Sequence, residues 1–314
     1  MLYVGDSHFR LPEIPERSTG EMRGRRYRYG RRVNRILSLY LRWREAEIIE
    51  NVLDYEQEGP IVTIWLNRPE VHNAVNDVLA KALRDAWTRF RDDETALVAI
   101  LAGRGPSFSS GADLTRIEGL NRPDTYLNPD FIYRGTGYLG FTRMTDIFKP
   151  TIAAIHGYCV AGGLEMALWC DIRLAAANAR FGCLERRWNV PLVDGGTQRL
   201  PRIVGWGRAM DLILTGREID AETALAWGLV SAVTPEDTAY PIARKWAERM
   251  ADYPQGALRT DKQAAMRGWG LPLEEALRTE AMLGMTQLNT PEFTEGVQRF
   301  RTRRTKGAER NATD

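Results

Sequence analysis

Short apolar runs alternate with amphipathic stretches along most of this chain. Three of these runs predict buried strands: residues 97–101, 151–155 and 173–177. Residues 47–55 and 61–67 predict an opening hairpin, and residues 76–91 predict an amphipathic helix. Helices are expected from about residue 208 to the end of the chain. This order predicts an α/β core that differs from a doubly wound nucleotide-binding fold.

The strand at 151–155 leads into a glycine turn and then an apolar helix. Residues 156–163 predict the turn, and Leu164 is expected to open the helix. Glu165 then lies in the first helical turn, where a carboxylate among apolar residues is costly unless a function or a partner retains it. Gly162 and Gly163 leave free N–H groups at the positive end of the helix dipole. The residues alone allow two interpretations of Glu165, a group that complements the dipole or a group with a chemical role.

A second glycine loop follows the strand at 97–101. Ser110, Gly111, Ala112 and Asp113 lead from this strand into a helix, with Asp113 as a candidate cap. One N–H group from each glycine loop, converging on a carbonyl oxygen, would form an oxyanion hole. Glycine is also common in ordinary tight turns, so neither loop alone distinguishes an oxyanion hole from a tight turn.

Two further acids stand in the segment 180–200. Glu185 lies beside Arg186 and Arg187, which allows either a surface ion pair or an acid–base partner for Glu165. The adjacent guanidinium groups are expected to lower the pKa of Glu185. Asp194 precedes a glycine pair, where it could cap the following helix or act as a third acid in a pocket.

Six segments, in order, resemble the crotonase superfamily, the enoyl-CoA hydratase/isomerase family. They cover roughly residues 48–304: LNRPEVHNAVN (66–76), FSSGADL (108–114), PTIAAIHGYCVAGGLEMALWCDIRLAAANARFG (150–182), DGGTQRLPRIVG (194–205), LTGREIDAETALAWGLVSAV (214–233) and FTEGVQRFRTRR (293–304). The resemblance implies a crotonase-like ββα spiral core over 47–250 and a C-terminal helical trimerisation region over 251–314. It also implies homotrimers that pair into hexamers.

The resemblance assigns catalytic roles to four positions. Ala112 and Gly162 match the two backbone N–H groups of the oxyanion hole, and Glu165 and Glu185 match the two glutamates of the hydratases. Family isomerases typically keep only the second acid, so both glutamates together imply an enoyl-CoA hydratase. Glu165 would act as base toward water and Glu185 would protonate the α-carbon. The implied mechanism needs no metal or redox cofactor, and coenzyme A is part of the substrate.

Other positions match places where the family binds its acyl-CoA substrate. They are Ala74, Ser110, Gly111, Asp113, Gly163, Asp194, Phe300 and Arg303. Phe300 and Arg303 would contact CoA from the same or a neighbouring subunit, although a solvated basic tail explains the arginines equally well. The aromatic residues between 114 and 149 suggest a bulky or cyclic acyl group, with packing of an irregular loop as the alternative.

Composition narrows the remaining possibilities. The chain has 314 residues, 44% of them hydrophobic, which is enough to bury a large core. Its formal net charge of +2 does not indicate binding to nucleic acid or to a membrane. No apolar run is long enough to span a bilayer. Three cysteines without metal-type spacing suit a reducing cytoplasm, and a count of three histidines argues against a His-rich metal site. No Ser/His/Asp pattern favours a hydrolase triad.

Residues 1–46 fall outside the family pattern and are rich in arginine, above all over 22–35. They are expected to be an extension that is disordered or not native to the protein. One explanation is that translation starts at Met22 or later. A transit peptide is also possible, but four acidic residues argue against it. Two alternative functions stay open. One is another acyl-CoA reaction of the family, catalysed by an isomerase, lyase or hydrolase. The other is an RNA-binding relative that uses the arginine-rich segment.

Overall fold

The computed structural model describes residues 52–115 and 135–311, with side chains described as far as residue 302. The described residues belong to one unit of the chain, which spans residues 45–314. The arginine-rich extension, and with it the RNA-binding alternative, lies outside the described residues. The same holds for residues 47–51 of the expected hairpin and for residues 116–134 of the aromatic segment.

The described residues form a large mixed sheet and a small second sheet. The large sheet has the order β1-β2-β3-β4-β6-β9: β1 (Leu53–Glu58), β2 (Ile61–Leu66), β3 (Val98–Gly103), β4 (Thr151–Ile155), β6 (Ile172–Ala176) and β9 (Ala232–Thr234). The β1–β2 hairpin is antiparallel, and the other pairs are parallel. The small sheet has the order β5-β7-β8: β5 (Tyr158–Val160), β7 (Arg180–Gly182) and β8 (Glu218–Asp220).

The chain winds from one sheet to the other in a spiral. The strand β4 of the large sheet leads to β5 of the small sheet and then to α5 (Gly162–Trp169), and β6 leads in the same way to β7. Isolated bridges between Val75 and Ala112, and between Ser109 and Cys159, extend the small sheet to earlier turns of the spiral. The ββα spiral that the resemblance implies is therefore confirmed.

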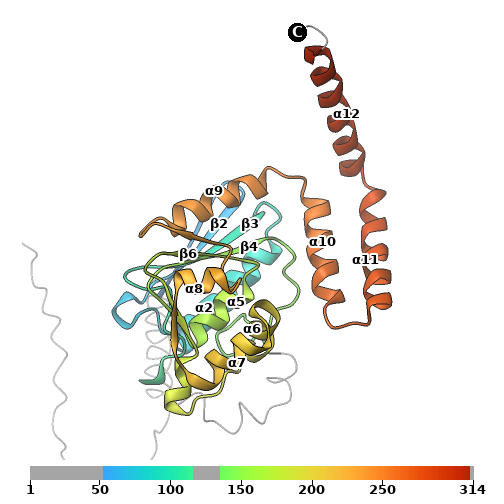
Figure 1. Ribbon diagram of the computed structural model, residues 1–314. Coiled ribbons are helices and arrows are strands. Elements are labelled where there is room, and N and C mark those ends of the chain that lie inside the picture. Colours follow the sequence, from blue (N-terminus) through green and yellow to red (C-terminus); the bar gives the residue numbers. More distant parts are fainter. Residues whose placement is uncertain (1–51, 116–134, 312–314) are drawn as a thin grey trace, which may run out of the picture. The chain divides into compact units, whose positions relative to one another are not determined.

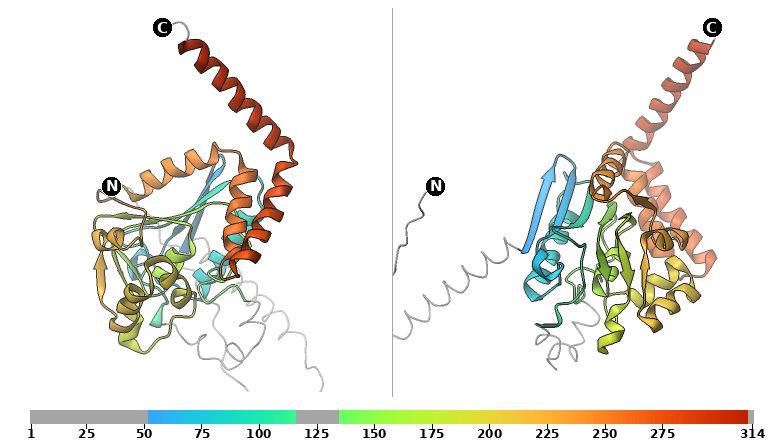
Figure 2. Two further views of the ribbon diagram at one scale, coloured as in Figure 1. Left: turned by 45° about the vertical axis from the view of Figure 1, so that its right-hand side comes forward. Right: turned by 60° about the vertical axis from the view of Figure 1, so that its left-hand side comes forward.

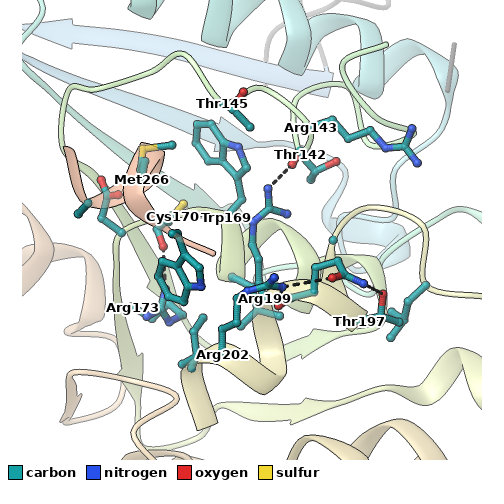
Figure 3. A pocket seen from close by; sticks show the side chains of 18 of the residues that line it. Thr142, Arg143, Thr145, Trp169, Cys170, Arg173, Thr197, Arg199, Arg202 and Met266 are labelled. Carbon is teal, nitrogen blue, oxygen red and sulfur yellow. Dashed lines mark hydrogen bonds between the residues drawn. The ribbon is translucent and has the colours of Figure 1, made fainter. Parts of the chain in front are cut away.

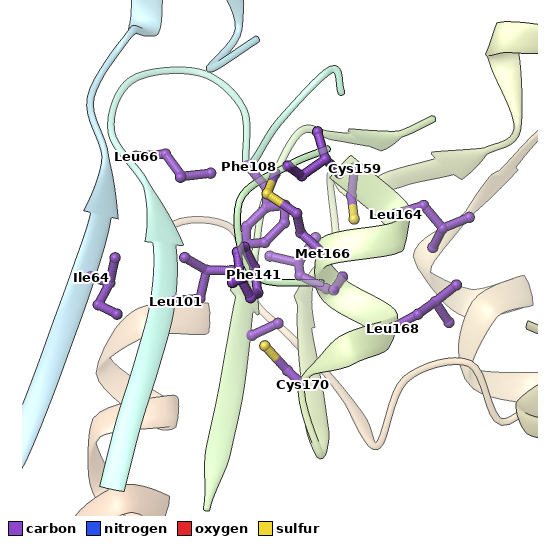
Figure 4. Close-up of a cluster of buried hydrophobic side chains, with 14 of the residues drawn as sticks. Ile64, Leu66, Leu101, Phe108, Phe141, Cys159, Leu164, Met166, Leu168 and Cys170 are labelled. Carbon is purple, nitrogen blue, oxygen red and sulfur yellow. The ribbon is translucent and has the colours of Figure 1, made fainter. Parts of the chain in front are cut away.

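Both faces of the large sheet are covered, which explains why its central strands are apolar throughout. On one face, Ile100 and Ile152 pack against small residues of α9 (Ala239–Ala251), which lies along the sheet in Figure 1. On the other face, Ile64 and Leu101 point toward α5, whose Met166 fills the space between sheet and helix in Figure 4. This second cluster fixes the position of α5.

The remaining helices surround this core and follow it in sequence. They are α2 (Asp77–Asp92), α6 (Gly196–Val204), α7 (Trp206–Thr215), α8 (Ala221–Ala226), α10 (Gln255–Gly268), α11 (Leu273–Leu288) and α12 (Pro291–Asn311), with short 3₁₀ turns η1 (Pro69–Val71) and η3 (Leu184–Trp188). Two further views in Figure 2 show the helices α10 to α12 following α9. The C-terminal region is helical, as predicted.

Several predicted elements are confirmed and others need correction. The strand 151–155 and the helix after Asn76 are confirmed, and the Asn76 side chain caps that helix by accepting from the Leu79 N–H at 2.9 Å. The expected turn at 156–163 is wrong in part, because it contains β5 and because α5 begins at Gly162 rather than Leu164. The region after 208 is also not purely helical, since β8 and β9 interrupt it.

Candidate active site

The two glycine loops meet because of how the small sheet is paired. The Ser109 N–H donates to the Tyr158 carbonyl at 2.9 Å, and the Val160 N–H donates to the Ser109 carbonyl at 3.1 Å. The residues that follow therefore run side by side, and the backbones of Gly111 and Gly162 touch. A Cβ added to Gly111 would lie 2.6 Å from the Gly162 nitrogen, and the Gly111 φ of +93° also favours glycine. The spiral thus brings both predicted oxyanion loops to one place.

The N–H group of Ala112 faces away from the neighbouring chain segment. The Val75 N–H donates to the Gly111 carbonyl at 2.7 Å, and the Asp113 N–H donates to the Val75 carbonyl at 2.9 Å. Because alternate N–H groups of an extended segment point to opposite sides, the Ala112 N–H points the other way. No hydrogen bond within the described residues uses it.

The Gly162 N–H is presented by a strained elbow. Ala161, the N-cap of α5, has φ 51° and ψ −127°, a backbone conformation that residues with a side chain rarely adopt. Gly162 is the first residue of the helix, so its N–H has no intrahelical acceptor. Among the described residues nothing else accepts from it. Strain of this kind persists where the surrounding structure enforces it, which is common at functional sites.

Glu165 is buried and held by the start of α6. Its Oε1 accepts from the Asp194 N–H at 2.9 Å and from the Gly196 N–H at 2.8 Å. No hydrogen bond of the described residues uses Oε2, so this oxygen is left for chemistry. Burial raises the pKa of Glu165 to about 8, with a further increase from the Asp194 carboxylate, while the two N–H donors oppose the rise.

Glu185 lies in η3 with 5% of its surface exposed, so its carboxylate is buried, and its ion pair with Arg186 is not the expected surface pair. Its Oε1 lies 3.5 Å from an Arg186 nitrogen, and its buried Oε2 has no partner among the described residues. Burial raises the pKa of Glu185 and outweighs the lowering by Arg186, which corrects the expected direction. Arg187 points elsewhere, donating to the Gly216 carbonyl at 2.9 Å.

Asp194 does not cap the following helix. The N-cap of α6 is Gly195, and no side chain caps it. The Asp194 carboxylate is buried and instead accepts from the Tyr138 N–H at 2.7 Å and the Leu139 N–H at 3.3 Å. Burial raises the pKa of Asp194, although these bonds and one from the Thr142 hydroxyl oppose the rise. Asp194 thus holds a neighbouring loop.

A cavity of about 240 Å³ collects these groups. It is lined by Ser110, Ala112, Gly162, Glu165, Glu185 and Asp194 from among the predicted residues. Its apolar wall contains Tyr138 of the predicted aromatic segment, together with residues that were not predicted: Leu114, Leu139, Leu184, Trp188, Val190, Pro191, Leu192 and Val193. The aromatic content of 114–149 signals part of this wall, but only the fold selects which residues reach it.

The other predicted binding residues lie behind the cavity or away from it. Ala74 and Asp113 are buried, and Asp113 forms an ion pair with Arg68 at 3.0 Å. Gly163 packs its Cα against the Ser109 carbonyl, with no room for a Cβ. Phe300 on α12 is 68% exposed and outside the cavity lining, and the Arg303 side chain lies outside the described residues.

A larger cavity, of about 1010 Å³, lies between α6 and α10 and shares Leu192 and Val193 with the smaller one. Figure 3 shows its basic and aromatic lining, with Arg199 reaching toward Thr142. Neither glutamate and neither oxyanion N–H lines it, so we place the reaction in the smaller cavity. In the described ranges, no cluster of three or more His, Cys, Asp or Glu side chains could hold a metal ion. No helix there is long and apolar enough to cross a membrane.

Comparisons with known proteins agree with this geometry. A profile of the family described as enoyl-CoA hydratase/isomerase matches residues 56–309. A probable enoyl-CoA hydratase of Rhizobium meliloti is 38% identical, over 78% of this chain and 93% of that protein. The (E)-benzylidenesuccinyl-CoA hydratase of Thauera aromatica is 36% identical, over 79% and 95%. The crystal structure of an enoyl-CoA hydratase from Mycobacterium marinum superimposes with a TM-score of 0.74 at 31% identity, over 81% and 97% of the two chains. The chain therefore belongs to the enoyl-CoA hydratase/isomerase family.

Proposed function

We propose that this protein is an enoyl-CoA hydratase that adds water, in syn fashion, to a trans-2-enoyl-CoA thioester. One observation carries the proposal: two buried glutamates and two outward N–H groups line the same small cavity. Water addition requires a group that takes a proton from water and a group that gives one to the α-carbon. It also requires donors for the charge that develops on the thioester oxygen.

In the proposed reaction the thioester oxygen lies between the N–H groups of Ala112 and Gly162. These donors draw electrons from the β-carbon, where water attacks. Glu165 takes a proton from the water through its unused Oε2, and Glu185 gives a proton to the α-carbon. The enolate-like transition state places its charge on the thioester oxygen, where the fixed N–H groups stabilise it more than they stabilise the substrate.

The protonation of the two glutamates follows from their shared burial. The reaction starts with one ionised and one protonated carboxyl, and like charges close together favour that state. Because the pKa of Glu165 is about 8 in the empty site, its basic form becomes more populated as the pH rises toward 8. The pH profile belongs to the coupled pair, so single variants are needed to assign each group.

The proposal includes an acyl-CoA thioester as the one small-molecule partner and no metal or redox cofactor. It also includes a homotrimer, or a hexamer of paired trimers, in which α12 of the same or a neighbouring subunit brings Phe300 and Arg303 to the CoA moiety. Exposed apolar side chains on α11 support such an assembly, among them Leu273, Leu277, Met282 and Met285. A cytoplasmic location is a prediction of the same kind, supported by three free, buried cysteines, which suit a reducing compartment. A role in fatty-acid β-oxidation is a prediction that rests on the hydratase reaction alone.

The test is hydration of a panel of trans-2-enoyl-CoA esters with short, long and aromatic acyl groups. Loss of the conjugated-enoyl absorbance and a mass gain of one water are expected for at least one ester. Glu165→Gln and Glu185→Gln should each abolish the gain, while Glu222→Gln, in the first turn of α8 and exposed, should not. An isomerase that relies on Glu185 alone would survive Glu165→Gln. Binding of CoA esters with no water gain across the panel would contradict the proposal.

A further inference from the structure

Asp194 lies at a junction of three elements, and each of its polar groups bonds to a different one. Its N–H donates to the Glu165 carboxylate on α5. Its carbonyl accepts from the Arg199 guanidinium on α6 at 3.0 Å. Its carboxylate accepts from the main chain of Tyr138 and Leu139. A single buried residue thus connects the proposed base with a loop 56 positions away in the sequence.

These bonds hold the polar backbone of the loop 137–142, whose Phe141 side chain is buried against Trp87. Gly137 has φ +99°, and a Cβ added there would lie 2.6 Å from the Asp194 carboxylate, so glycine permits the close approach. The Thr142 hydroxyl donates to the same carboxylate oxygen. The Thr142 carbonyl accepts from Arg199 at 2.6 Å, a contact drawn in Figure 3. The segment 194–199 therefore holds this loop at both ends.

The same loop forms part of the acyl-side wall of the cavity. Tyr138 and Leu139 both line it. The Leu139 side chain also lies against the first residue of α5, since its Cδ1 would be 3.0 Å from a Cβ added to Gly162. A displacement of the loop would therefore change the shape of the wall next to an oxyanion donor.

We propose that Asp194 is a positioning residue that determines acyl-group selectivity and sets the charge environment of Glu165. Its carboxylate fixes the wall formed by Tyr138 and Leu139, and its main chain and negative charge act on the base. This inference rests on the proposed hydratase function for its kinetic readouts. Asp194 links the wall to the base, because its carboxylate accepts from the loop and its N–H donates to Glu165. No other residue in the described part of the chain makes both kinds of bond.

The charge part of the proposal depends on which groups face Glu165. They are Asp194 and Glu185, which raise its pKa, together with Arg199 and Cys183, whose own pKa values respond to the Glu165 charge. Of the two acids, Asp194 has the larger effect. Removing its charge should lower the pKa of Glu165.

The first variant, Asp194→Asn, removes the charge and keeps an oxygen that can accept from the loop. The acidic limb of the pH profile of kcat/KM should move to lower pH by about one pH unit. The ratio of kcat/KM between short and bulky enoyl-CoA esters should stay within about twofold of the starting protein. The matched control is Asp220→Asn, which replaces an exposed N-cap with a residue that caps equally well and should move neither quantity.

The second variant, Asp194→Ala, also removes the acceptor for the loop. It should change the acyl preference by about tenfold or more, mainly through KM, and should also move the pH profile. Phe141 stays buried against Trp87, with ring centroids 5.2 Å apart, so the loop keeps an apolar anchor and the variant should fold. Thr142→Val removes one donor to the Asp194 carboxylate and leaves the Asp194 side chain in place. It should change the acyl preference in the same direction as Asp194→Ala, which provides a second measure if Asp194→Ala folds poorly.

Two readouts separate this proposal from the hydratase assignment. Dissociation constants for saturated acyl-CoA esters of different acyl size report wall selectivity without any reaction. Infrared titration of the buried carboxyl, identified by its loss in Glu165→Gln, reports the Glu165 environment without turnover. If no ester is hydrated but both readouts change as stated, only the assigned reaction is wrong. If Asp194→Asn leaves the Glu165 titration unchanged, or if Asp194→Ala and Thr142→Val leave acyl preference unchanged, the role of Asp194 is refuted.

Discussion

Replacing Glu165 by Gln should remove activity and, at alkaline pH, stabilise the protein. The side chain is 3% exposed, and its Oε1 accepts two main-chain N–H bonds that a glutamine oxygen can also accept. The amide nitrogen would then take the place of Oε2 on the cavity side. The substituted side chain would therefore keep the geometry while losing the cost of a buried charge.

The magnitude follows from the pKa of the buried carboxyl. Burial raises the pKa of Glu165 from an ordinary 4.5 to about 8. Between these pH values the folded protein binds the proton and the unfolded chain does not, so the free energy of unfolding falls as the pH rises. At about 1.4 kcal/mol per pH unit, the loss reaches at most about 5 kcal/mol above pH 8. The variant escapes this loss, and its advantage should disappear near pH 4.5.

Urea unfolding across a pH series measures this difference. Both proteins should be compared at one concentration, since assembly changes apparent stability by mass action. The difference in unfolding free energy between Glu165→Gln and the starting protein should grow with pH, while Glu222→Gln, at an exposed position, should track the starting protein. Parallel curves for Glu165→Gln and the starting protein from pH 5 to pH 9 would refute the reasoning, because they would show that Glu165 titrates alike in folded and unfolded states.

Three further substitutions test the local geometry. Gly163→Ala should destabilise the protein by about 3 kcal/mol, because a Cβ would overlap the Ser109 carbonyl. The control Gly207→Ala, in open space on α7, should stabilise the protein slightly, and equal melting temperatures would contradict this. Ala161→Val should cost about 1–3 kcal/mol and lower kcat, since a β-branched residue tolerates φ 51° poorly; unchanged urea midpoint and kcat would argue against strain at the elbow. Arg199→Met leaves two carbonyl oxygens without their donor, and each should lower the free energy of unfolding in urea by about 1–3 kcal/mol. A total decrease below about 1 kcal/mol would contradict the assigned contacts.

The sequence predicts correctly those helices and strands that have a strong local signal, such as an apolar run or a helix cap. The strand 151–155 is a continuous apolar run, and the helix after Asn76 has both a cap and an apolar stripe. In contrast, β8 and β9 have three residues each, and only their pairing partners make them strands. The helix after Asp194 is present, but the interpretation of Asp194 as its cap is wrong, because Gly195, at φ +106°, takes the N-cap position without any side-chain cap.

The candidate site shows the same division between local and long-range causes. The glycine turns and the two glutamates could be predicted because each lies within a short motif. The direction of the Glu185 pKa could not, since the sequence shows the adjacent Arg186 but not the burial that outweighs it. The role of Asp194 could not be predicted either, because its carboxylate binds a loop 56 residues away.

The pairing of β3 with β4 has a consequence for how such a protein can diversify. These strands are direct neighbours in the sheet, although residues 104–150 separate them in sequence. Near the start of this connection, Ser109 forms a bridge with Cys159, and Ala112 forms one with Val75. At its end, β4 pairs with β3 on one side and with β6 on the other. Within this connection Tyr138 and Leu139 line the cavity, so substitutions at these two positions can reshape its wall while both sheets keep their register. Selection for a new acyl group, or a laboratory library aimed at one, can act there without changing the two glutamates or the strand pairing that positions them.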